Sequence, residues 1–115
     1  MTLFKSFGSF FLLLSLVNAE LNHPVNQQEI SYIHVLFDWD QEPDAIGYNL
    51  QVSNMQQDII LDTESQTPLY IENTGQFNWD KSYLWRVRPK YIDESYGQWI
   101  DTLMFKIKES VDINL

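Results

Sequence analysis

Four aromatic residues fall outside the inward-facing pattern of the chain, at positions where a ring could bind a partner. Trp79, Tyr91, Tyr96 and Trp99 lie in or near segments that we expect to be loops. An exposed aromatic ring can stack on the face of a sugar or anchor a protein partner. The alternative is that Trp79 and Trp99 cap the two ends of a hydrophobic core. These four residues are the candidate surface-binding residues, with a protein or a polysaccharide as the partner.

Two arginines, Arg86 and Arg88, stand two positions apart in the alternating segment 83–89. Because alternate residues of a strand share a face, both side chains point to the same side. Together they could hold a carboxylate or a sulfate through paired hydrogen bonds. The alternative is that each pairs with a Glu or Asp on a neighbouring strand.

Acidic residues alternate over a short stretch, at Asp38, Asp40, Glu42 and Asp44. Oxygen ligands at this spacing can surround a calcium ion, but the glycine and final Glu of an EF-hand loop are absent. A solvated turn is the simpler explanation, and we predict no metal site and no cofactor.

Residues suited to catalysis are also missing. The two histidines, His23 and His34, are distant in sequence and there is no cysteine, which makes a poor set for a metal site or a catalytic triad. There is no glycine-rich phosphate loop and no Gly-x-Ser-x-Gly motif. We therefore predict no catalytic residues and a protein that is not an enzyme.

The elements that must position these residues are β-strands. In residues 83–89 the side chains of Tyr83, Trp85 and Val87 point to one side, while Leu84 and the two arginines point to the other. This period of two predicts a half-buried strand. Similar segments recur about every ten residues, which is typical of a sandwich or barrel. We expect strands at 30–39, 46–53, 59–63, 69–71 and 100–107, and a hairpin loop at 93–97 in which Gly97 is available for a positive φ.

The chain has 115 residues, enough for one domain. Residues 1–19 resemble a signal peptide, with Lys5, an apolar run and small residues before Glu20. We expect this segment to be removed, so that the mature chain has no membrane span and is secreted, to the extracellular space, the cell surface or the periplasm. We divide the remainder into an extended lead-in (20–29), the domain (30–108) and a tail or linker stub (109–115).

The amino-acid composition limits which partners the protein can bind and how its fold can be stabilised. The net charge is −9, with 16 acidic against 7 basic residues, and this field repels nucleic acid. The absence of cysteine means that packing alone holds the domain together. Four Trp, six Tyr and seven Phe can supply that core. We expect Trp39 and Trp85 to be buried in it, and the acidic charge favours a monomer.

Several short motifs, in order, resemble a fibronectin type III domain. They are Phe37-Asp38-Trp39, Tyr48-Asn49-Leu50-Gln51-Val52, Phe77 six residues before Tyr83, and Gly97-Gln98-Trp99 followed by Phe105. The resemblance covers most of residues 23–108 and is greatest to modules of secreted bacterial proteins. It implies an immunoglobulin-like sandwich of about seven strands, with antiparallel sheets A-B-E and C′-C-F-G. It also implies that the Tyr83 hydroxyl bonds to backbone across the E–F corner.

The fold and the missing catalytic set together predict a secreted, non-catalytic module that acts in protein interaction or as a spacer. The alternatives are an N-terminal accessory module of a larger secreted enzyme, such as an arylsulfotransferase or a glycoside hydrolase, and a small carbohydrate-binding module.

Overall fold

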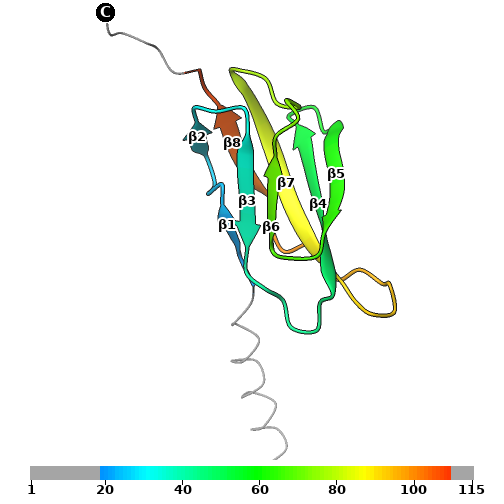
Figure 1. Ribbon diagram of the computed structural model, residues 1–115. Coiled ribbons are helices and arrows are strands. Elements are labelled where there is room, and N and C mark those ends of the chain that lie inside the picture. The colour runs from blue at the N-terminus through cyan, green and yellow to red at the C-terminus, as the bar shows by residue number, and fades with distance from the viewer. Residues whose placement is uncertain (1–18, 110–115) are drawn as a thin grey trace, which may run out of the picture.

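The computed structural model describes residues 19–109, which form eight β-strands and no helix (Figure 1). The strands are β1 (Leu21–His23), β2 (Gln28–Ile30), β3 (Val35–Trp39), β4 (Gly47–Asn54), β5 (Ile59–Ser65), β6 (Leu69–Glu72), β7 (Lys81–Lys90) and β8 (Leu103–Ile107). No helix in this part of the chain is long and apolar enough to cross a membrane. The expected signal peptide and tail lie outside the described residues, apart from Ala19 and Glu109.

The strands form two sheets that pack face to face, which confirms the predicted all-β sandwich. One sheet has the order β1-β3-β6 and the other the order β2-β8-β7-β4-β5. The centre of the larger sheet is β7, the longest strand, whose whole length pairs with β4 or β8. From Ser82 on, its inward residues are buried and its outward residues are half-buried, as the alternation in the sequence predicts.

One pair of neighbouring strands departs from the expected antiparallel arrangement. The strand β2 runs parallel to β8, with Gln28 opposite Phe105 and Ile30 opposite Ile107. This pairing arises because the segment expected to be an extended lead-in belongs to both sheets. Its first part, β1, pairs with β3, and the chain then crosses over to the edge of the larger sheet.

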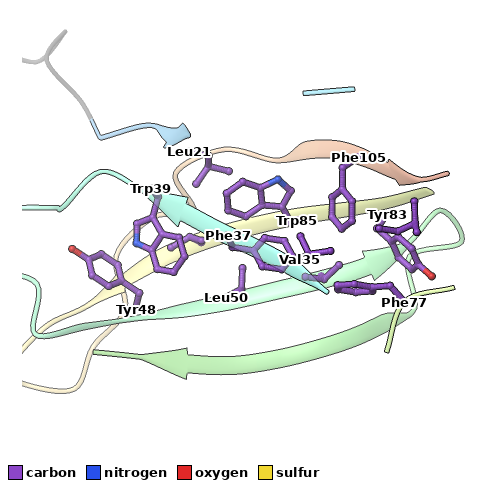
Figure 2. Close-up of a cluster of buried hydrophobic side chains, with 13 residues drawn as sticks. Leu21, Val35, Phe37, Trp39, Tyr48, Leu50, Phe77, Tyr83, Trp85 and Phe105 are labelled. Carbon is purple, nitrogen blue, oxygen red and sulfur yellow. The ribbon is translucent and has the colours of Figure 1, made fainter. Parts of the chain in front are cut away.

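The core between the sheets consists largely of aromatic side chains (Figure 2). Trp39 and Trp85 are both buried, as predicted, with exposed fractions of 3% and 0%. Trp39 packs edge-on against Tyr48, with ring centroids 5.5 Å apart, and Trp85 packs edge-on against Phe37 at 5.1 Å. Edge-to-face rings are a favourable arrangement, so they stabilise the core beyond the area they bury.

At the other end of the core, Tyr83 holds the turn that leads into β7. Its ring is buried against Phe77 and Phe105. Its hydroxyl oxygen accepts a hydrogen bond of 2.8 Å from the backbone N–H of Asn78. The predicted bond across this corner is therefore present, and it fixes the direction from which the chain enters β7.

Candidate functional site

The outward face of β7 carries a row of cations. Arg86, Arg88 and Lys90 alternate with the buried residues Val87 and Pro89, so their side chains all lie on the outer surface of the larger sheet. They stand opposite Gln51, Asn49 and Gly47 of β4.

The chain after β7 folds back over this row. The backbone N–H of Gly97 bonds to the carbonyl of Pro89 at 2.9 Å, and that of Ile100 bonds to the carbonyl of Val87 at 2.8 Å. These bonds hold residues 97–100 along the side of β7. They place the rings of Tyr96 and Trp99 over the outward side chains of the strand.

Rings and cations then alternate along the strand. The Arg86 guanidinium lies 3.8 Å from the centroid of the Trp99 ring. Arg88 lies 4.4 Å from Trp99 and 4.1 Å from Tyr96, and the Lys90 ammonium is 5.9 Å from Tyr96. All four distances are within the range of about 6 Å for a cation–π interaction. We call this set, Arg86, Trp99, Arg88, Tyr96 and Lys90, the cation–aromatic ladder.

Gly97 is required by this fold-back, though not for the predicted reason. Its φ is not positive; in the 93–97 loop the positive φ belongs to Glu94, at 71°. A Cβ atom on Gly97 would lie 2.8 Å from Cγ of Pro89 and 3.0 Å from the Tyr91 hydroxyl. The glycine is therefore needed for close approach to β7.

The arginines bond to amides rather than to the acids that sequence reasoning suggested. Arg86 donates from Nε and Nη2 to Oε1 of Gln51, at 3.3 and 2.9 Å, and Arg88 donates from Nε to Oδ1 of Asn49 at 2.9 Å. Both amides then donate to the carboxylate of Asp62, at 2.8 Å from Asn49 and 3.2 Å from Gln51. Within residues 19–109 neither guanidinium forms a salt bridge. The positive charge of both arginines is thus held in place without a direct counter-ion.

The far end of the ladder is neutralised. Lys90 forms a salt bridge with Glu64 at 3.4 Å, and the Tyr96 hydroxyl donates a hydrogen bond to the same carboxylate. The bond from Tyr96, helped by Lys90, lowers the pKa of Glu64 below its ordinary value. The same carboxylate raises the pKa of Tyr96.

At the near end a hollow of about 300 Å³ adjoins Arg86. This volume is at the lower end of the range of small-molecule sites, about 300–1,000 Å³. We call it the Arg86 hollow; it is lined by Gln51, Ser53, Gln57, Ile59, Leu84, Arg86 and Thr102. The lining contains one cation and no acid.

The four aromatic candidates do not form one site. Tyr91, Tyr96 and Trp99 gather beside the end of β7, and Trp99 is half-buried on the arginines rather than capping the core. Trp79 lies in the loop that precedes β7, at the opposite end of the sheet (Figure 1), and is 40% exposed. It too lies outside the core cluster.

The acidic residues around the predicted turn contact the N-terminal segment of the chain. Asp38 bonds to Nδ1 of His23 at 2.9 Å, while Asp40 accepts bonds from the N–H of Glu20 and the side chain of Asn22. Among residues 19–109 no three His, Asp or Glu side chains come close enough together to hold a metal ion.

Sequence reasoning missed the amides that organise the ladder. Asn49 is 4% exposed, which is unusual for an amide side chain, and with Gln51 it faces β7 from β4. A signal was present in the sequence: Asn49 and Gln51 are outward-facing residues of one alternating strand, just as Arg86 and Arg88 are of another.

Comparisons with known proteins add information on the fold only. No family model matches the chain, and no curated protein matches it. Among solved structures, a β-1,2-glucanase from Parabacteroides distasonis matches with a TM-score of 0.60 and 15% identity over 83% of this chain. CopC from Methylosinus trichosporium OB3b matches with a TM-score of 0.52 and 11% identity, covering 84% of this chain and all of CopC. This chain corresponds to only 13% of the glucanase.

Proposed function

We propose that the chain is an exported, non-catalytic module of the fibronectin type III kind, which binds a partner through the outer face of its larger sheet. The observation that carries the proposal is the cation–aromatic ladder, a row of rings and uncompensated, half-buried arginines on the outer face of the larger sheet. Trp, Tyr and Arg are the residues most enriched at the hot spots where proteins bind partners.

Strand order supports the assignment to this kind of module. The strand orders β1-β3-β6 and β8-β7-β4-β5 correspond to those of the expected sheets A-B-E and G-F-C-C′. The hydrogen bond from Asn78 to Tyr83 lies where that family is expected to bond across its E–F corner. A shared fold does not imply a shared function, so the binding role depends on the ladder.

Two measurements test the proposal. The purified chain should give no turnover with polysaccharide, ester and phosphoester substrates; hydrolysis that is lost when a residue of the Arg86 hollow is replaced would contradict the proposal.

Export is tested separately. Residues 1–19 fused to a reporter enzyme that lacks a leader should export that enzyme. Mass spectrometry of the secreted chain should then find Glu20 at the N-terminus, whereas retention of residues 1–19 would contradict export.

A second candidate function is that of an accessory module in a larger secreted enzyme. The observation that favours it is that a sandwich of similar fold makes up a small part of a glucanase chain. Sequencing the gene beyond the codon of Leu115 tests it directly. An in-frame catalytic domain would support the accessory role, and a stop codon would favour a module that acts alone.

A further inference from the structure

We infer that the Arg86 hollow binds the carboxylate of a sugar acid, a uronic acid residue within a glycan. The inference rests on the proposed function, because it names the partner of the same sheet face. It depends on three properties of the hollow: its charge, its preorganised guanidinium and its mixed lining.

The charge of the hollow is opposite to that of the molecule. The chain has 16 acidic and 7 basic residues, yet the lining holds Arg86 and no acid. The nearest carboxylate in the hydrogen-bond network, Asp62, is held by Asn49 and Gln51 and does not contact the guanidinium. A densely charged polyanion would be repelled by the net charge of −9. A ligand with an isolated carboxylate would meet the positive charge of Arg86 at close range.

The guanidinium is fixed before any ligand arrives. One face of it lies on the ring of Trp99, and two of its nitrogens bond to Gln51. Within residues 19–109 the remaining nitrogen, Nη1, makes no hydrogen bond, so it is the donor left for a ligand. A donor that is already immobilised loses little entropy on binding, which increases affinity. A carboxylate oxygen that accepts from Nη1 would form a charge-assisted hydrogen bond, which is stronger than one between neutral groups.

The rest of the lining suits a sugar ring. Gln51, Gln57, Ser53 and Thr102 supply amides and hydroxyls, which can both donate to and accept from sugar hydroxyls. Ile59 and Leu84 supply an apolar surface for the C–H face of the ring. A ligand with one negative charge, many hydroxyls and an apolar face fits all three kinds of side chain.

Titration of the full chain with a neutral trisaccharide in which one residue is replaced by galacturonic acid tests the inference, with binding followed by calorimetry and by NMR of the side-chain amides. The fully methyl-esterified trisaccharide keeps the rings and removes the charge. We expect it to bind about tenfold more weakly or worse, since it loses a hydrogen bond between charged groups. The amide signals of Gln51 and Gln57 should shift with the acid.

Variants assign the binding to the hollow. Arg86→Gln should weaken binding of the acid about tenfold or more, whereas Lys106→Gln, which removes the same charge from the same sheet outside the hollow, should leave it unchanged. Thr102→Val, at an exposed position, should weaken binding of acid and ester alike. If Arg86→Gln fails to fold, this variant and the amide shifts still decide the question.

Three results would overturn the inference: equal affinity for acid and ester, a folded Arg86→Gln protein with unchanged affinity, or equal binding of a glutamate tripeptide. None of these results would contradict the proposed non-catalytic binding role. That role would be contradicted by turnover of a substrate.

Discussion

The two buried tryptophans differ in the state of their indole N–H groups. Trp85 donates a hydrogen bond of 3.1 Å to the carbonyl of Pro24, which links β7 to the segment between β1 and β2. Trp39 Nε1 is buried, and within residues 19–109 it has no partner. A buried donor without a partner costs free energy, so the two residues contribute differently despite similar burial.

We predict that Trp85→Phe destabilises the protein by about 1–2 kcal/mol more than Trp39→Phe, because only the first change leaves a buried carbonyl without its donor. Replacement of either tryptophan by Ala should cost about 3–5 kcal/mol. The measurement is the free energy of unfolding in urea for all four variants. Equal costs for the two Phe variants would show that the Pro24 bond contributes nothing.

Glu64 and Tyr96 should make the end of the ladder sensitive to pH. The pKa of Glu64 is lowered, so its contribution to stability is present above the ordinary glutamate pKa of about 4.3 and is lost as the pH falls through the folded value. The pKa of Tyr96 is raised, so its contribution is present below about 10 and is lost as the pH rises through the folded value. The pair should therefore be intact at neutral pH.

NMR titration of the Glu64 carboxyl group tests this. In Tyr96→Phe its midpoint should move upwards, because the main cause of the lowered pKa is removed. Tyr91→Phe removes a nearby hydroxyl that does not bond to Glu64 and is the matched control. An unchanged midpoint in Tyr96→Phe would mean that the hydrogen bond is absent in solution.

At the scale of elements, alternation in the sequence predicted the inner faces of β3, β4, β7 and β8. Val35, Phe37 and Trp39 are buried as predicted, and so are Leu50, Val52, Phe105 and Ile107. Alternation identifies the faces because neighbouring residues of a strand point in opposite directions. The same logic placed Arg86 and Arg88 outside but could not name their partners, since these depend on the register between β4 and β7.

The N-terminal segment could not be predicted in the same way. The strands β1 and β2 have three residues each, which is too short for a period to be visible. Their pairing depends on contacts with β3 and β8, which are distant in sequence. The expected long strand at 30–39 is likewise not continuous: Ile30 ends β2, and β3 begins only at Val35.

The turn after β7 should be intolerant of a side chain at position 97. We predict that Gly97→Ala costs about 1–3 kcal/mol, because its Cβ atom would overlap Pro89 and force residues 97–100 away from the strand. The near-UV circular dichroism of Trp99 should weaken at the same time. Gly75→Ala is the control: its φ of 80° strains the backbone, but the added Cβ meets nothing within 4 Å. It should destabilise the protein without changing the Trp99 signal.

At the scale of the whole molecule, charge and sheet edges determine self-association. Unpaired strand edges can join between copies, and natural proteins often protect them with charged residues. The edge strand β5 carries the exposed acids Asp62 and Glu64, and the net charge of −9 adds a general repulsion. Both features favour separate molecules.

We therefore predict a monomer in sedimentation velocity at physiological salt, over the micromolar to millimolar range. Asp62→Asn with Glu64→Gln removes charge from the β5 edge and should be the variant most prone to associate. A stable dimer of the unaltered protein would show that these charges do not prevent pairing.

The parallel pairing of β2 with β8 also has a mechanical consequence. The chain enters the sandwich at β1 and leaves it after β8 at the opposite end (Figure 1). A pull on the two ends would draw β2 and β8 in opposite directions along their length. The backbone hydrogen bonds between them would then be loaded in shear and would have to break together rather than one at a time. A body built in this way resists stretching along its axis.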